Sequence, residues 1–136
     1  MSTTQKIALA SCALALFTPI PSPAHGGEVE VVKAQVRCTK TRTCAIQVTL
    51  RHQDEGWTHY ADRWEVLTPE GEVLAKRVLR HPHVEEQPFT RMLRGVAIPA
   101  ELSEVRIRAH DSVHGYAGTL LSVQIPPTQV PEPRQP

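Results

Sequence analysis

The sequence has little of three features that usually point to a function: charge of one sign, long apolar runs and aromatic residues. Fifteen Lys and Arg against fourteen Asp and Glu leave a formal net charge of +1, so no basic field indicates a nucleic-acid partner. No apolar run reaches the roughly 18 residues that a membrane-spanning helix needs. Aromatic residues make up only 4% of the sequence. The chain of 136 residues is long enough for one small domain. We therefore expect neither nucleic-acid binding nor a membrane span.

Motifs that mark common enzyme classes are also missing. Past residue 24 the serines are Ser103, Ser112 and Ser122, and none lies in the G-x-S-x-G context of a hydrolase nucleophile. The sequence contains no glycine-rich phosphate-binding motif. The adjacent Glu85 and Glu86 would point to opposite faces of an extended segment, so they form no acid–base pair. We therefore expect a protein that is not an enzyme.

What the sequence does have is an amino-terminal export signal. Residues 1–6 are polar with one positive charge, and residues 7–18 (IALASCALALFT) form an apolar core of twelve residues. Ser22-Pro23-Ala24 places small residues at the two key positions of a secretory cleavage site. We predict a signal peptide over residues 1–24, and hence a periplasmic or secreted protein.

The tetrapeptide LASC at residues 9–12 supports an alternative. It resembles the bacterial lipobox, in which the cysteine, here Cys12, is lipidated and becomes the first residue of the mature protein. Only residues 7–11 would then form the apolar core, which is shorter than the usual stretch of roughly 7–15 residues. We therefore favour cleavage after Ala24 over the lipoprotein alternative.

Downstream of this leader, apolar and polar residues alternate in short segments that end at turn signals. A phase slip at Val31-Val32 indicates a β-bulge in the first segment. The sequence between two of these segments, Thr68-Pro69-Glu70-Gly71, has the composition of a type I turn. The alternation predicts strands over residues 29–38, 44–52, 60–66, 73–79, 89–98, 105–111 and 121–125.

Seven short strands in about a hundred residues are typical of an immunoglobulin-like sandwich. We predict an all-β fold, a single immunoglobulin-like antiparallel β-sandwich of about seven strands over residues 25–125, with a small barrel as the alternative. Residues 126–136 contain five prolines and almost no apolar side chains, which predicts a disordered tail. Tyr60 and Asp62 alternate in phase with Trp64 and are expected on its face of the strand. The predicted core comprises Val48, Leu50, Trp64, Val66, Leu93, Ile107 and Val123.

Two cysteines remain after the predicted leader. Cys38 and Cys44 flank the polar connection between the first two predicted strands. Outside the cytoplasm an even pair in this position is expected to form a disulfide. Their five-residue spacing fits neither a C-x-x-C redox motif nor the usual zinc spacing. We therefore predict a structural Cys38–Cys44 disulfide.

All seven histidines follow the leader, and two of them suggest a metal site. His81 and His83 would share one face of an extended segment, with Cβ atoms roughly 7 Å apart. Acidic residues Glu85 and Glu86 follow directly. Cleavage after residue 24 would give His25 a free amine beside its imidazole, a chelate that suits copper(II).

The other histidines have less specific contexts. We expect His52 to bond the backbone at a strand end and His110 to face solvent. His59 lies close in sequence to Asp62, which favours a carboxylate–imidazole pair, structural or supporting a metal ligand. His114 precedes a glycine, and turn chemistry alone would explain it.

A metal site needs three or four ligands, so the His81/His83 pair would have to recruit others. The simpler alternatives are a solvated loop for this pair and a flexible terminus for His25. The sequence predicts one site for a divalent transition metal, copper or zinc, with candidate ligands His25, His59, His81, His83 and His114.

Arg91 has two interpretations. In the structural one it pairs with Glu86 or Asp62 while Phe89 joins the core. In the functional one Arg91, Arg80 and Trp57 form a patch that binds an acidic group. We favour the structural interpretation.

Three sequence blocks carry a resemblance to known proteins. GWTHYAD (residues 56–62), HPH (81–83) and EQPFTR (86–91) resemble those of small uncharacterised secreted bacterial proteins. This resemblance implies an exported β domain and supplies no activity. His25 and the pair Asp111/His114 are similar to the copper-binding ends of CopC-type periplasmic β-sandwiches, although two residues separate this pair where CopC-type proteins have one.

Two functions follow from these features. The first is an exported β-sandwich that binds copper or zinc through a histidine cluster. The alternative is a metal-free module that binds a protein or a component of the cell envelope. Convergence of the candidate histidines in space would favour the first function.

Overall fold

The alternating segments form β-strands in the computed structural model of the protein, which describes residues 27–127. Within this range the order of elements is β1 (Glu30–Cys38), β2 (Thr43–Arg51), β3 (Ala61–Leu67), β4 (Val73–Val78), β5 (Phe89–Ala97), β6 (Glu104–Asp111) and β7 (Leu121–Gln124). No helix in the described range is long and apolar enough to cross a membrane. The predicted signal peptide, Cys12, His25 and most of the predicted tail lie outside the described residues.

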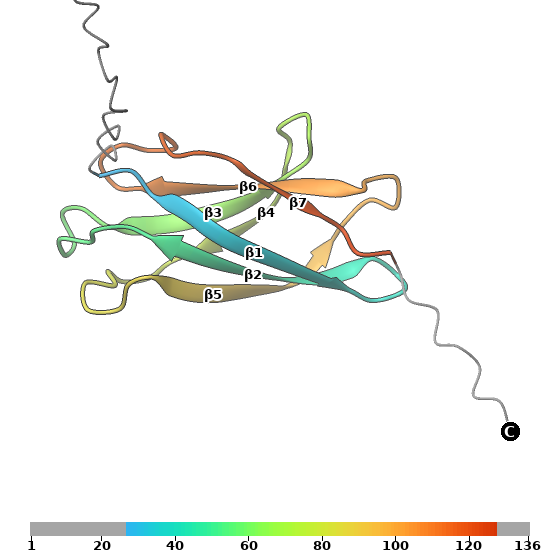
Figure 1. Cartoon of the computed structure of the whole chain (residues 1–136), viewed down its shortest axis with the longest axis horizontal. Coiled ribbons are helices and arrows are strands. Elements are labelled where there is room, and N and C mark those ends of the chain that lie inside the picture. The colour runs from blue at the N-terminus through green and yellow to red at the C-terminus, as the bar shows by residue number, and fades with distance from the viewer. Residues whose placement is uncertain (1–26, 128–136) are drawn as a thin grey trace, which may run out of the picture.

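The strands form two antiparallel sheets, with strand orders β1-β2-β5 and β4-β3-β6-β7 (Figure 1). The Thr68 turn explains why β4 pairs with β3. The amide of Gly71 donates to the Thr68 carbonyl at 2.9 Å, and the amide of Glu72 donates to Thr68 Oγ1 at 3.1 Å, so the chain reverses at once. The predicted immunoglobulin-like sandwich is confirmed, and the barrel alternative is wrong. The strand β4 belongs to the four-stranded sheet.

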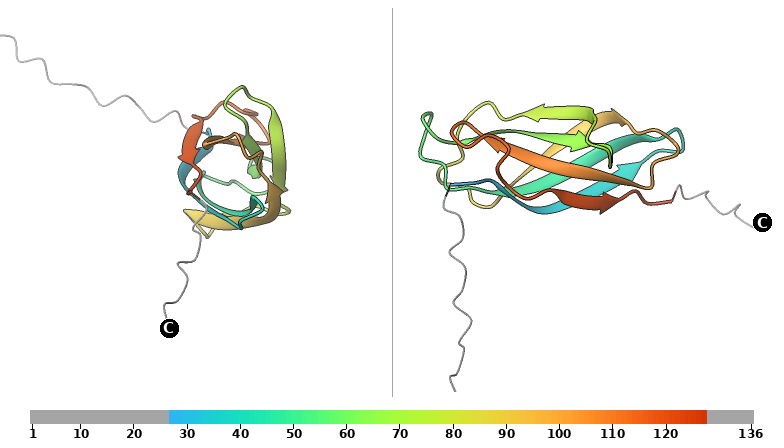
Figure 2. Two further views of the ribbon diagram at one scale, coloured as in Figure 1. Left: turned by 90° about the vertical axis from the view of Figure 1, so that its right-hand side faces the viewer. Right: turned by 90° about the horizontal axis from the view of Figure 1, so that it is seen from above.

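The core lies between the two sheets, which Figure 2 shows in views along and across the strands. Trp64, Phe89 and Ile46 are the largest side chains that are fully buried there. Five of the predicted core residues are at most 1% exposed, and the other two, Leu93 and Val123, are partly buried against that core. The alternation of apolar residues therefore identified the inward faces correctly.

The strand pairings contain four register shifts, and two of them bear on the sequence predictions. The predicted one is confirmed, because the β1–β2 register shifts between Val31 and Lys33. A second shift, between Ala61 and Arg63 where β3 pairs with β6, was not predicted. Its extra residue is Asp62, so the expectation that Tyr60 and Asp62 share the inward face of Trp64 is wrong. Neither residue belongs to the core cluster.

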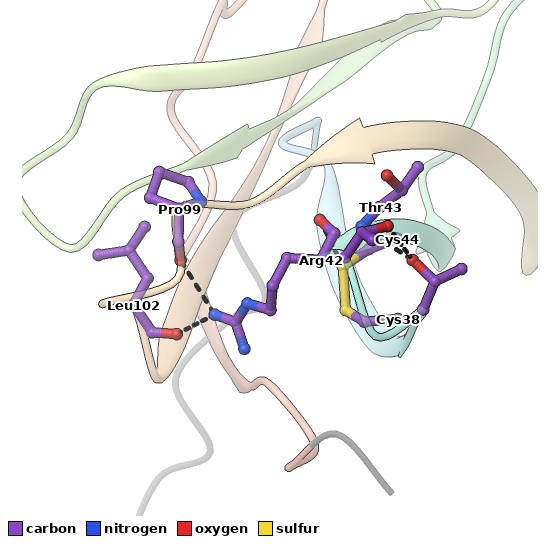
Figure 3. Close-up of a disulfide and its surroundings, with 8 residues drawn as sticks. Cys38, Arg42, Thr43, Cys44, Pro99 and Leu102 are labelled. Atoms are coloured by element: carbon purple, nitrogen blue, oxygen red, sulfur yellow. Dashed lines mark hydrogen bonds between the residues drawn. A yellow bond between two sulfur atoms is a disulfide. The ribbon is translucent and has the colours of Figure 1, made fainter. Parts of the chain in front are cut away.

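The predicted disulfide joins the ends of β1 and β2 (Figure 3). Cys38 and Cys44 are paired neighbours in the register of these strands. Arg42 adopts a φ of 64° in the turn between them, and its guanidinium donates to the carbonyls of Pro99 and Leu102. This arginine therefore ties the β1–β2 turn to the β5–β6 turn at one end of the sandwich.

The opposite end, on the left of Figure 1, is built from loops. The β2–β3 loop (residues 52–60), the β4–β5 loop (79–88) and the β6–β7 loop (112–120) meet there, beside the segment that leads into β1. Six of the seven histidines lie on or next to these loops. The loop end is therefore the place to look for a functional site.

Candidate metal centre

Three loop-end residues bring potential metal-binding atoms together. His52 directly follows β2, His59 lies near the end of the β2–β3 loop, and Asp111 is the last residue of β6. One ligand atom from each lies within 4.8 Å of the other two. His114 is adjacent, with its ring centre 4.9 Å from that of His59. We call His52, His59 and Asp111 the imidazole–carboxylate group.

Asp111 shapes its own turn. Its Oδ1 accepts hydrogen bonds from the amides of Val113, at 2.9 Å, and His114, at 2.7 Å. Gly115, at φ 69°, closes the turn through two backbone hydrogen bonds with Asp111. This turn places His114 Nδ1 at 3.1 Å from Oδ1 of Asp111. Three residues of sequence therefore suffice to bring His114 beside the carboxylate.

The other carboxylate oxygen of Asp111 is buried, and no described residue donates a hydrogen bond to it. Burial by itself would raise the pKa of Asp111. The amides of His114 and Val113, and then the charges on His114 and His52, outweigh burial and hold that pKa below its usual value. Asp111 is therefore an ionised carboxylate whose Oδ2 has no hydrogen-bond donor in the described part of the chain.

His59 also has a buried nitrogen without a hydrogen-bond partner among the described residues, Nε2. This nitrogen lies 3.3 Å from Oδ1 of Asp111, while Nδ1 lies 3.5 Å from Glu55 Oε2 at the surface. The ring therefore lies between an exposed and a buried carboxylate.

His52 is held on both sides. Its Nδ1 is 2.5 Å from Oδ1 of Asp54, and its Nε2 is 2.9 Å from the carbonyl oxygen of Gly27. Asp54 also accepts from the amides of Ala61, at 3.0 Å, and His83, at 2.6 Å. Both ring nitrogens of His52 therefore face oxygen atoms that accept hydrogen bonds.

Gly27 lies directly over the site. A Cβ atom added to it would lie 2.6 Å from Cε1 of His114, and its φ is 119°. Only glycine fits this close approach of the backbone to the ring. The segment that leads into β1 therefore covers one side of the imidazole–carboxylate group.

His81 and His83 lie side by side in the β4–β5 loop, with ring centres 4.6 Å apart. His81 is exposed, whereas His83 is buried and stacks on Phe89 at 4.0 Å. The structure thus brings His114 next to His59 of the imidazole–carboxylate group and leaves His81 and His83 as a separate pair. Asp54 lies between the groups, since its two oxygens bind His52 and the amide of His83.

Several pairings differ from the sequence interpretation. His59 lies beside Asp111 and Glu55, while Asp62 pairs with His110 at 2.6 Å. His110 was expected to face solvent, but its side chain is only 16% exposed. Asp111 was not proposed as a ligand from the residues alone, although its position three residues before His114 was a usable signal. The backbone bond expected for His52 is present.

The sequence is similar to that of a known protein. A protein of Halomicrobium mukohataei that bears the name "Putative lipoprotein" is 38% identical over 96 residues, or 71% of this chain. The chain spans 47% of the length of that relative. No protein-family model matches the chain, and no solved structure matches it. The resemblances to small secreted proteins and to CopC-type proteins therefore stay predictions.

Proposed function

We propose that the protein is an exported β-sandwich that binds one divalent transition metal ion, copper or zinc, at its loop end. His52, His59 and Asp111 are the proposed ligands, and His114 is the fourth candidate. The observation that carries the proposal is Oδ2 of Asp111 in the imidazole–carboxylate group, to which no residue between 27 and 127 donates a hydrogen bond. A buried, ionised oxygen without a donor is unfavourable, and a cation would remove that penalty.

The ligand types suit these metals. Imidazole nitrogen with carboxylate oxygen is a common donor set for zinc, and imidazole also suits copper. Asp54 on Nδ1 would orient His52 in the way that carboxylates orient metal-bound histidines. The metal would take the place of the Gly27 carbonyl at Nε2 of His52. Because protons compete with a metal for imidazole nitrogen, binding should weaken as the pH falls through roughly 6.

Three observations support export. The sequence begins with a predicted leader, the relative is named a lipoprotein, and Cys38 is bonded to Cys44. Disulfides persist in oxidising compartments outside the cytoplasm. We propose that the protein is exported to the cell envelope or out of the cell. The predicted cleavage after Ala24 would give a periplasmic or secreted chain that begins at His25, whereas the name of the relative favours the alternative of a lipid anchor at Cys12.

Calorimetric titration of zinc and copper(II) into the tag-free chain that begins at His25 tests the metal site. We expect Asp111→Asn and His59→Ala each to weaken binding by about 10- to 100-fold. His110→Ala is the matched control, because His110 bonds Asp62 outside the group, and should leave affinity unchanged.

Two results would reject the proposed site. One is an unchanged affinity in His59→Ala, a change in a loop outside the hydrophobic core that the fold should tolerate even if Asp111→Asn does not fold. The other is the absence of binding tighter than about micromolar in the parent chain, since a three-ligand site should exceed that.

A second candidate function is the metal-free module, which binds a protein or an envelope component. Trp57 and Val113 favour it, because they are 68% and 59% exposed on adjoining loops. Backbone and side-chain bonds between Tyr60 and Ser112 join these loops. Co-sedimentation with isolated cell envelopes tests this candidate. We expect Trp57→Ala to abolish this co-sedimentation. Equal sedimentation of the parent protein and the variant would show that the surface around Trp57 does not bind the envelope.

A further inference from the structure

A small pocket opens beside the loop end, between the end of β4, the following loop and β5. Its volume is about 150 Å³. The side chains that line it are Arg77, Val78, Leu79, Arg80, His81, His83 and Arg91. We call it the arginine pocket.

The lining of the arginine pocket is basic. It combines three arginines with two histidines, and these lining residues, all from the described part of the chain, include no Asp or Glu. Arg91 is neutralised on its outer side by a two-point hydrogen bond to Glu86, at 3.0 and 3.1 Å. Within residues 27–127 neither Arg77 nor Arg80 makes an ion pair. The pocket therefore carries uncompensated positive charge.

The pocket also holds buried polar atoms that lack partners among the described residues. These are Nε of Arg77 and both ring nitrogens of His83. The side chain of His83 is only 2% exposed, and stacking on Phe89 and the bond from its amide to Asp54 fix its position. Nε of Arg77 is a donor, and the His83 ring carries at least one N–H donor. Buried donors without acceptors are unfavourable, so their presence at a pocket points to a ligand that accepts hydrogen bonds.

The charge decides which ligand fits. A metal cation beside His81 and His83 would be repelled by the guanidinium groups of Arg77 and Arg80, which have no ion-pair partner among the described residues. Burial, followed by the charges of Arg91 and His81, lowers the pKa of His83, and Glu86 and Asp54 only partly oppose this. A bound anion would offset the same charges. Guanidinium groups match the geometry of carboxylate and phosphate oxygens.

We propose that the arginine pocket binds an oxyanion, the carboxylate or phosphate group of a small acidic ligand. Arg77, Arg80 and a ring N–H of His83 are the donors. The volume is below the range of roughly 300–1,000 Å³ that holds a whole drug-sized ligand, so the pocket takes the charged group and the remainder lies outside. This proposal is independent of the metal site, because the two use different residues.

Nuclear magnetic resonance titration tests the pocket. The chain that begins at His25 is freed of metals on a chelating resin and then titrated with inorganic phosphate and, separately, with acetate, at constant ionic strength. We expect saturable shifts in the backbone amides of Arg77, Arg80 and His83 with at least one of these anions. The anion that binds more tightly identifies the preferred group.

Two variants with the same loss of charge sharpen the result. Arg80 is exposed, so Arg80→Gln should fold normally and weaken binding by about five- to tenfold. Arg94→Gln removes an exposed arginine of β5 outside the pocket and should leave binding within about twofold. Equal losses in the two variants, or no saturable shift with either anion, would overturn the proposal.

Discussion

Asp54, Glu65 and Asp111 are all buried carboxylates, but the partners of their oxygen atoms differ. Both oxygens of Asp54 accept hydrogen bonds, from His52, Ala61 and His83. Both oxygens of Glu65 also have donors. Asp111 alone of the three keeps an oxygen without a donor among the described residues. Asp54 and Glu65 therefore stabilise the fold, whereas Asp111 has an oxygen that a ligand could bind.

Glu65 gives a prediction for stability. Tyr116 donates to Oε1 at 2.7 Å, and Arg108 donates to Oε2 at 2.7 and 2.8 Å. Burial would raise the pKa of Glu65, but these two donors outweigh it and lower the pKa below 4.5. The ionised group therefore stabilises the fold above that pH, and its contribution is lost as the pH falls below about 4.5.

We expect Glu65→Gln to unfold more easily at pH 7, by about 1–3 kcal/mol, because Arg108 loses its charged partner. Urea unfolding between pH 7 and pH 3 measures this. The parent protein should lose more stability than the variant below pH 4.5. If the free energy of unfolding falls with pH equally in the parent protein and the variant, Glu65 is not the acid-sensitive group.

The two tryptophans form a natural pair of test and control. Trp64 is completely buried between the sheets, whereas Trp57 is 68% exposed. We expect Trp64→Ala to lower the free energy of unfolding by about 3–5 kcal/mol. Trp57→Ala should change it by no more than about 0.5 kcal/mol. Similar losses in chemical denaturation would mean that the inward face of β3 was assigned wrongly.

At the scale of elements, the sequence predicts whatever depends on neighbours in the chain. Strand positions, the bulge at Val31 and the Cys38–Cys44 hairpin follow from local alternation and spacing, and each is confirmed. The bulge near Asp62 depends on pairing with β6, so no local pattern revealed it.

The candidate site shows the same limit more sharply. His59 and Asp111 are 52 positions apart in the sequence and meet only because β3 pairs with β6. Sequence spacing drew attention to His81 and His83, but it could not show that Arg77 and Arg91 surround them. Contacts between loops come from topology, and composition or periodicity does not encode them.

The β1–β2 hairpin gives a prediction at this scale. Replacing both cysteines, Cys38→Ser and Cys44→Ser, should lower the free energy of unfolding by about 2 kcal/mol, because the unfolded chain loses a short closed loop. Metal affinity should not change, since the hairpin lies at the end of the sandwich opposite the loops. Urea unfolding and metal titration of the double variant check both parts. A large loss of metal affinity would contradict the separation of the two ends.

At the scale of the whole molecule, the two ends of the sandwich have different tasks. The disulfide and Arg42 fasten one end. The other end carries the imidazole–carboxylate group and, beside it, the arginine pocket. Asp54 connects them, because it bonds His52 in the first and the amide of His83 in the second. A cation site and an anion site are thus proposed on one rigid support.

We propose that metal binds to the imidazole–carboxylate group and not to His81 and His83. The most direct test is a long-range ¹H–¹⁵N spectrum of the histidine rings in the chain that begins at His25, recorded before and after addition of one equivalent of zinc. We expect ring nitrogens of His52 and His59 to shift to the positions of metal-bound imidazole, while those of His81, His83 and His110 stay in place. Metal-induced shifts confined to His81 and His83 would contradict this account.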